Sequence, residues 1–335
     1  MKGINLLVGT VLGLFTQLSM AAEEVNVYSY RQTTLVQPML DVFTDQTGIQ
    51  VNMVYAKKGM LERLKHEGRN TPADLIFTVD IGRLSDIKVA GLTQAVESEA
   101  LNQNIPQSQR DEEGHWYGLT ARARILVAAK SRAKGEIDTY AGLASESMKG
   151  RVCTRSGKHP YMIGLTAAMI VHNGAENTEQ WLRGFKDNLA RKPQGNDRAQ
   201  VKAIKEGECD VAVINNYYMY KMLTDPKQQA WADSVDVIFP DQAGNGTHMN
   251  ISGMAMSRYA KNPDSAMKLM EFLASDVAQE MYSELNGEYP VKPDVALSEQ
   301  LTMWGDFKRD DVSLTEVAVH RAEAIKMMDR VGFDD

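Results

Sequence analysis

GNDRAQVKAIKEGECDVAVINNYYMYKML, residues 195–223, decides the fold class of this chain. The stretch begins with a helix cap and helical spacing, has a glycine stop at Gly207, and then passes into the apolar strand DVAVI. A capped helix followed at once by a strand is typical of α/β folds. Two adjacent phenols, Tyr217 and Tyr218, come just past the end of that strand.

The same alternation of strand and helix occurs throughout the N-terminal part of the chain. EEVNVYSY (23–30), residues 50–55 and ADLIFTVD (73–80) have strand patterns, and helical spacing separates them. We therefore expect an α/β fold with mixed, mostly parallel sheets. No Pro/Ser-rich linker divides the 335 residues, so two lobes joined by crossing segments fit better than two domains on a tether.

The first 21 residues have the pattern of a secretory signal peptide. Lys2 precedes an apolar stretch from Ile4 to Leu18, and Ser19-Met20-Ala21 resembles a cleavage site. The alternative is a membrane anchor, but the stretch is shorter than the roughly 20 residues that a spanning helix needs. We predict an exported protein. Its net charge of −7 argues against nucleic acid or an anionic membrane surface as a partner.

Two cysteines, Cys153 and Cys209, are present in the chain. An even number in an oxidising compartment favours one disulfide, and each cysteine adjoins a strand pattern, so neighbouring strands could be bridged. Two buried free thiols are the alternative. Two cysteines without clustered histidines do not form a zinc pattern.

Three tyrosines occupy positions that suit a binding site. Tyr217 and Tyr218 follow a strand, and Tyr161 opens a helix after the loop that follows GRVC. Ligands in open α/β sheets bind outside the carboxyl ends of the strands. Phenolate oxygen is a hard donor that suits a hard, highly charged ion, and ferric iron is the biologically common ion that fits. The alternative is a sugar or amino-acid pocket in which the rings only line the wall.

Two arginines suggest an anion near these tyrosines. Arg122 and Arg124 alternate along TARAR and therefore share one face of a predicted strand. A guanidinium can hold carbonate or a carboxylate through two parallel hydrogen bonds. An ordinary surface salt bridge is the alternative for either residue.

Several segments together resemble the periplasmic ferric-ion-binding proteins of bacterial iron ABC transporters. The resemblance covers nearly the whole chain after the signal peptide. Its motifs are VNVYSYRQ (25–32), GLTARARILV (118–127), GRVCTRSGKHPYMIGLTAAMI (150–170), the block from GNDRAQVKAIKEGECD to NNYY (195–218), GTHMNISGMAM (246–256) and NGEYPV (286–291).

The resemblance implies a two-lobed periplasmic-binding-protein fold, type II-like, with a hinged cleft. One lobe would comprise residues 22–120 with 250–335, and the other residues 121–249. The chain would be a periplasmic monomer that passes Fe³⁺ to an inner-membrane ABC permease, not an enzyme.

The resemblance also implies a set of site residues. Iron would be bound by tyrosines at positions 161, 217 and 218, with a synergistic anion, often carbonate. Arg122 is the first choice for holding that anion and Arg124 the second, and the loop from Thr154 to Gly157 would add backbone donors.

The chain departs from the family in the loop after its first strand. Gln32 and Thr33 stand where many relatives have a histidine or a further tyrosine, and Tyr30 is a possible additional phenolate. The first lobe would then supply no protein ligand. Two other functions stay open: the same fold binding a polyamine, a thiamine-like cation or an oxyanion, and a secreted hydrolase. The hydrolase is disfavoured because no GxSxG or HExxH motif is present.

Overall fold

The computed structural model describes residues 23–335, so the predicted signal peptide lies outside the described residues. The strands are β1 (Glu24–Ser29), β2 (Gln50–Tyr55), β3 (Leu75–Thr78), β4 (Tyr117–Ala129), β5 (Val152–Cys153), β6 (Val211–Asn215), β7 (Val235–Ile238) and β8 (Met249–Met256). The helices are α1 (Gln37–Thr47), α2 (Met60–Glu67), α3 (Ile81–Val89), α4 (Glu99–Asn104), α5 (Pro160–Asp187), α6 (Asp197–Glu206), α7 (Asn216–Leu223), α8 (Gln229–Ala232), α9 (Pro263–Leu273), α10 (Asp276–Asn286), α11 (Glu299–Thr302) and α12 (Leu314–Val331). Within residues 23–335 no helix is long and apolar enough to cross a membrane.

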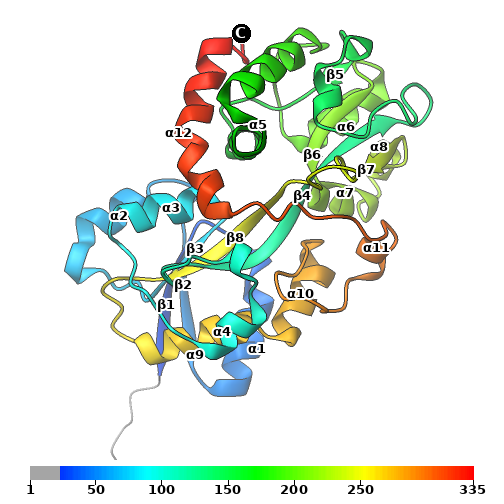
Figure 1. Ribbon diagram of the computed structural model, residues 1–335. Helices are drawn as coiled ribbons and strands as arrows, with labels where there is room; N and C mark the ends of the chain where they lie inside the picture. The colour runs from blue at the N-terminus through cyan, green and yellow to red at the C-terminus, as the bar shows by residue number, and fades with distance from the viewer. Residues whose placement is uncertain (1–22) are drawn as a thin grey trace, which may run out of the picture.

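Two long strands, β4 and β8, join the two halves of the molecule. They run side by side between the lower and the upper half in Figure 1. The strand order is β2-β1-β3-β8-β4-β6-β5, and β7 pairs with β4. The first part of β4 pairs with β8 up to Ala123, and from Arg124 onward β4 pairs with β6. The crossing segments expected from the sequence are therefore this strand pair, and the predicted two-lobed α/β fold is confirmed.

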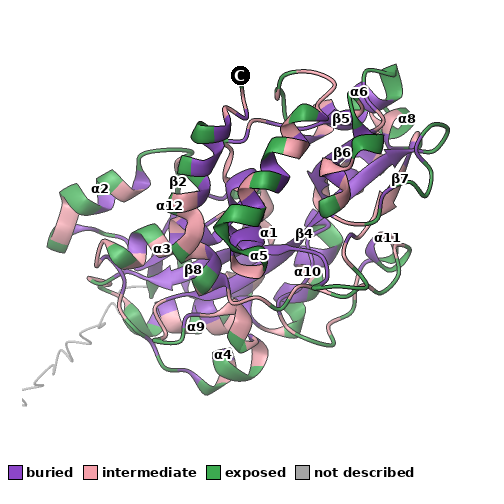
Figure 2. Cartoon of the chain, turned by 45° about the horizontal axis from the view of Figure 1, so that its top comes forward, coloured by how far each residue is buried: buried purple, intermediate pink, exposed green. Residues whose placement is uncertain are grey.

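The sheet is mixed, but it is not mostly parallel as the sequence suggested. β1 pairs in parallel with β2 and with β3, and β5 with β6. Every antiparallel pair described involves β4 or β8. The local pattern of a strand does not specify its direction in the sheet, which for β4 and β8 follows from their passage between the halves. Both strands are buried along their whole length, as Figure 2 shows in purple.

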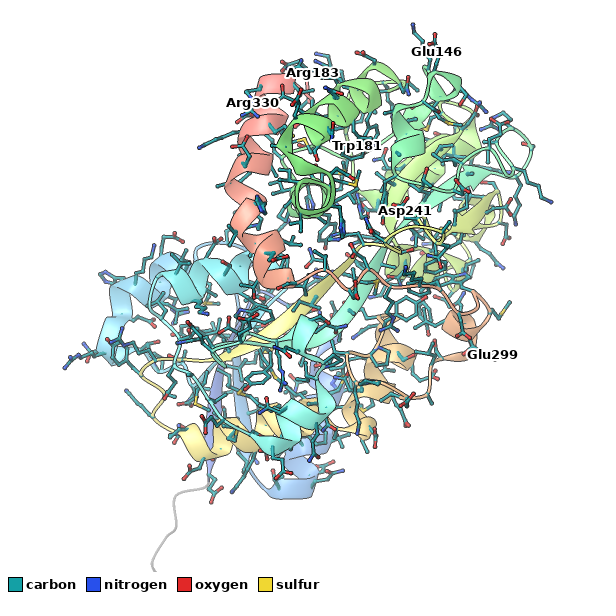
Figure 3. The ribbon with its side chains drawn as sticks, viewed as in Figure 1. Glu146, Trp181, Arg183, Asp241, Glu299 and Arg330 are labelled. Atoms are coloured by element: carbon teal, nitrogen blue, oxygen red, sulfur yellow. A yellow bond between two sulfur atoms is a disulfide. The ribbon has the colours of Figure 1, made fainter. Side chains whose placement is uncertain are left out.

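The C-terminal helix α12 packs against α5 in the upper half (Figure 1). Its apolar residues, including Val317 and Met327, share a core with the apolar side chains of α5. At the far end, Arg330 Nη2 lies 2.8 Å from Glu179 Oε2, and Arg183 contacts the same carboxylate (Figure 3). The lobe boundaries at residues 120 and 250 stay a prediction. Helix α12 was assigned to the lobe of residues 22–120 and 250–335, but it packs against α5 of the lobe of residues 121–249.

Helix α5 is interrupted at Gly174. Pro160 occupies the first turn, and Gly174 has φ 77° and ψ 164°, which breaks the helical path before a second helical segment begins. A positive φ of this kind favours glycine. The first segment therefore runs from the cleft to Asn173, and the second covers the outer face of the upper half.

The predicted disulfide between Cys153 and Cys209 is present, with a Cα–Cα distance of 5.9 Å. Cys153 ends β5, and Cys209 lies just before β6, the parallel neighbour of β5. The bridge therefore ties together the two strands that lead to the tyrosines.

His248, just before β8, is buried at the junction of the two halves. Its backbone N–H donates to Tyr140 Oη at 3.1 Å, and its carbonyl accepts from Arg124 N at 2.9 Å. Among the described residues neither ring nitrogen has a hydrogen-bond partner, and burial lowers the pKa of His248 to about 4. The imidazole is therefore neutral at pH 7.

We expect His248 to make the fold sensitive to mild acid. The pKa is about 4 when folded and 6.5 when unfolded, so the unfolded chain binds the proton first and stability falls as pH drops below 6.5. At pH 5 the loss from this residue is about 2 kcal/mol. Urea unfolding at pH 7.5 and pH 5 should show a smaller difference in His248→Gln than in wild type. Exposed His66→Gln is the control, and an equal pH effect in His248→Gln would contradict the assignment.

Candidate metal centre

The tyrosines predicted from the sequence meet at the ends of two neighbouring parallel strands. Helix α7 begins directly after β6, so Tyr217 and Tyr218 lie in its first turn. Tyr161 lies in the first turn of α5, which follows the loop after β5. The oxygens of Tyr161 and Tyr217 are 2.9 Å apart, and the rings of Tyr217 and Tyr218 lie 4.3 Å apart between centroids. The oxygens of Tyr161 and Tyr217 thus meet, and the Tyr218 ring lies against Tyr217.

The three phenols line a cleft of about 540 Å³ between the two halves. From the lower half it is lined by Tyr30, Arg31, Gln32, Leu35, Tyr55, Lys57, Val79, Asp80 and Arg83. The remaining lining residues are Arg122, Arg155, His159, Pro160, Tyr161, Asn196, Arg198, Tyr217, Tyr218, Lys221, Asn286 and Glu288. Basic side chains outnumber acidic ones in this cleft. The cleft therefore favours a ligand that carries negative charge.

Burial keeps the phenols of Tyr161 and Tyr217 protonated when no cation is bound. Desolvation raises the pKa of Tyr161 and raises the pKa of Tyr217 well above its ordinary value, although Arg122 opposes both shifts. A trivalent cation at the phenol oxygens would reverse this preference, because it becomes the largest local charge. In the described part of the chain, no group of three or more His, Cys, Asp or Glu side chains could hold a metal ion.

His159 caps α5 beside Tyr161. Its Nδ1 accepts a hydrogen bond from the Tyr161 N–H at 3.2 Å, and the two rings meet edge to face with centroids 4.4 Å apart. Burial and the nearby Arg155 lower the pKa of His159 to about 3. The imidazole is neutral, and it fixes the first turn of the helix that bears Tyr161.

Arg122 lines the cleft, and two of its five guanidinium N–H groups already have acceptors within the protein. Nη1 donates to Ser252 Oγ and Nη2 to the Ile251 carbonyl, both at 3.0 Å. Glu288 Oε1 lies 3.7 Å from Nη1. Arg122 therefore has Nε–H, which has no partner among the described residues, and the second hydrogen of each Nη left to offer an anion.

Arg124 and Thr154 do not line the cleft. Arg124 is buried behind Tyr161 and donates to Asp197 Oδ2 at 2.8 Å, and Thr154 is buried with its hydroxyl toward Met162 Sδ at 3.6 Å. The N–H of Gly157, in the loop proposed as a backbone donor, instead donates to Asp334 at 2.7 Å. The alternation along β4 predicted that Arg124 shares a strand face with Arg122, but the Arg124 guanidinium is paired with Asp197 and is not available to a ligand in the cleft.

Tyr30 and Gln32 both reach the cleft wall from the lower half. The hydroxyl oxygen of Tyr30 accepts a hydrogen bond from Leu61 N at 2.9 Å, and Arg83 covers its ring at 4.4 Å. Desolvation raises the pKa of Tyr30. Gln32 is exposed on the wall. The Tyr30 hydroxyl is thus engaged by α2, whereas the other three phenols face one another.

Sequence reasoning missed two features of the cleft. Arg198, in the first turn of α6, lies 5.5 Å from the Tyr218 ring centroid, and no carboxylate of residues 23–335 lies within 4.0 Å of its guanidinium. Glu288, in NGEYPV, accepts from Arg31 at 2.7 Å; burial opposes its ionisation, but the charges of Arg31 and Arg122 and the hydrogen bonds it accepts together lower its pKa. The sequence could have indicated Arg198 as a cleft residue, because it is a basic residue in the first turn of a helix, just after the cap residue Asn196.

The fold and the cleft define a two-lobed solute-binding protein. The chain belongs to the bacterial extracellular solute-binding protein family, whose model matches residues 39–309. It is 42% identical over 315 residues to iron uptake protein A1 of Synechocystis sp., covering 93% of this chain and 88% of that protein. The family resemblance inferred from the sequence motifs is thereby confirmed.

Two solved structures are similar along almost the whole chain. Ferric iron-binding protein A of Mannheimia haemolytica in an open conformation is 48% identical with a TM-score of 0.90, covering 94% of this chain and 100% of that one. The Trichodesmium protein in complex with iron and citrate is 40% identical with a TM-score of 0.89, covering 92% and 99%. The family is one of solute-binding proteins rather than enzymes.

Proposed function

We propose that this chain captures ferric iron in the periplasm and delivers it, as a monomeric carrier, to an inner-membrane ABC permease. The proposed ligands are the phenolates of Tyr161, Tyr217 and Tyr218. The observation that carries the proposal is the 2.9 Å separation of the Tyr161 and Tyr217 oxygens inside a cleft rich in basic residues. The relatives named for iron uptake and ferric iron binding support it.

Charge balance explains why both phenols and cations surround the site. Three phenolates offset the three charges of Fe³⁺, so an added anion such as carbonate needs basic partners. Arg122 and Arg198 both line the cleft and are the proposed partners. Arg124 and Thr154 lie behind the cleft. There Arg124 donates to Asp197, and the Thr154 hydroxyl faces Met162 Sδ.

The first lobe contributes no iron ligand in this proposal. Tyr30 keeps its bond to Leu61 N, and Gln32 offers only an exposed amide. The anion or water completes the coordination on that side. Closure of the lobes is favoured only to the extent that the loaded site binds the closed form better.

A visible-light titration of the metal-stripped mature protein with Fe³⁺, with and without bicarbonate, tests the proposal. Phenolate bound to ferric iron gives a charge-transfer band, whereas tyrosines that only line a wall give none. We expect the band to saturate at one iron per chain. Absence of a band would favour the alternative of another small solute in the same cleft, such as a polyamine, a thiamine-like cation or an oxyanion.

Arg198→Gln is expected to remove most of the bicarbonate effect on ferric affinity. A charge-assisted hydrogen bond is worth about 1.5–3 kcal/mol, so affinity in bicarbonate should fall about tenfold to a hundredfold. Binding without bicarbonate should change little. Lys202→Gln, on the exposed face of the same helix, is the matched control. A bicarbonate effect of unchanged size in Arg198→Gln would exclude this arginine as the anion partner.

A further inference from the structure

A second pocket, of about 430 Å³, lies outside the cleft and shares no lining residue with it. Three chain segments form it, and their lining residues are Pro106, Ser108, Gln109, Pro290, Val291, Lys292, Pro293, Asp294, Val295, Leu297, Arg309, Asp310 and Asp311. Its volume falls within the range of about 300–1,000 Å³ that is usual for small-molecule sites.

The pocket is attached to both crossing strands. Tyr289, next to the lining residue Pro290, exchanges backbone hydrogen bonds with Ala121 of β4 at 2.7 and 2.8 Å. Asp310 N donates to the Thr247 carbonyl at 2.9 Å, two residues before β8. The pocket therefore lies beside the strands about which the two halves are joined.

Arg309 is a half-buried cation without an acidic partner at this pocket. Its guanidinium lies over the rings of Tyr289 and Phe307, at 5.1 and 5.8 Å from their centroids, and Nη1 donates to the Pro290 carbonyl at 3.3 Å. Within the described chain no carboxylate oxygen lies within 4.0 Å of its nitrogens. The adjacent Asp310 is instead held by His172 at 2.8 Å.

This environment favours an anion at Arg309. Burial lowers the pKa of Arg309, and no carboxylate opposes the shift. The guanidinium still remains charged at neutral pH. A desolvated charge without a counter-ion is costly, and a planar carboxylate would satisfy the free edge of the guanidinium with two parallel hydrogen bonds.

The other walls define the rest of the ligand. Apolar side chains form half of the remaining lining: Pro106, Pro290, Val291, Pro293, Val295 and Leu297. Two exposed acids, Asp294 and Asp311, also line it and would repel ligands with several negative charges. We propose that this pocket binds a small organic monocarboxylate with an apolar body, its carboxylate on Arg309 and its body against the proline-rich wall.

Calorimetric titration of the metal-free mature protein with benzoate tests this site. We expect saturable binding of one benzoate per chain and at least tenfold weaker binding of the neutral isostere benzamide. Arg309→Met should weaken benzoate binding at least tenfold. Ser108→Trp should do the same by filling the pocket while leaving Arg309 in place, so it decides the question if Arg309→Met fails to fold.

Arg198→Gln separates this pocket from the iron cleft, which also offers arginines. Benzoate binding that is retained in Arg198→Gln and lost in the pocket variants supports the proposal. Absence of saturable binding, binding that survives both pocket variants, or binding lost only in Arg198→Gln would overturn it. These outcomes do not depend on iron, so the two proposals fail separately.

Discussion

Tyr217→Phe is expected to weaken ferric binding by more than about a hundredfold, beyond the usual cost of losing a partner outside the coordination shell, and to reduce the charge-transfer band to that of the remaining phenolates. The change removes one oxygen and leaves the ring against Tyr218. The lost hydrogen bond to Tyr161 should cost the fold only about 1 kcal/mol. Loss of binding in a folded variant would therefore report the ligand itself.

Tyr220→Phe is the matched control on the same helix. Its hydroxyl donates to the Glu284 carbonyl at 2.6 Å, and Tyr220 does not line the cleft. Its band and ferric affinity should equal those of wild type. A charge-transfer band and a ferric affinity equal to those of wild type in Tyr217→Phe would remove this residue from the proposed ligand set. Because burial keeps Tyr161 and Tyr217 protonated, iron binding should also release protons and weaken as pH falls.

Asp197→Ala is expected to lower the free energy of unfolding by about 3–5 kcal/mol, the range for breaking a buried charge pair. Asp197 is fully buried and accepts from Arg124 at 2.8 Å, from Arg155 at 2.7 Å and from Asn215 N at 2.8 Å. Its removal leaves two buried guanidinium groups without a counter-charge. It also frees the end of β6, from which Tyr217 is positioned.

Denaturant unfolding would measure the loss of stability in Asp197→Ala and compare it with the loss caused by breaking an exposed ion pair. Glu136 lies 2.7 Å from Arg151 and is 43% exposed, so Glu136→Ala should cost no more than about 1 kcal/mol. Equal losses in the two variants would mean that the Asp197 network contributes no more than an exposed ion pair. A neutral replacement of all three charged side chains should recover part of the stability lost in Asp197→Ala.

Local patterns predicted the elements that position the tyrosines. The stretch at residues 195–223 indicated a helix, a glycine stop and a strand, and α6, Gly207 and β6 lie there. Tyr161, Tyr217 and Tyr218 could be placed together because the carboxyl ends of parallel strands meet at one edge. The even number of cysteines in a chain predicted to be exported, each next to a strand pattern, favoured the disulfide over two free thiols.

Contacts between distant segments were not predictable in the same way. Asp197 looks like an ordinary first-turn acid of α6, and only the folded chain brings it between Arg124 and Arg155. That placement removes Arg124 from the cleft and leaves Arg198 facing it. The packing of α12 on α5 likewise joins segments more than a hundred residues apart, for which no local spacing exists.

All three proposed iron donors belong to the same side of the β4–β8 connection, on helices α5 and α7. A rotation about those strands would move the three donors together as one rigid group, and the lower half would close over them from the other side. Opening of the cleft would expose the metal to solvent while all three tyrosine donors kept their positions relative to one another. The ease of rotation about these strands would then set how quickly solvent or a competing chelator reaches the iron.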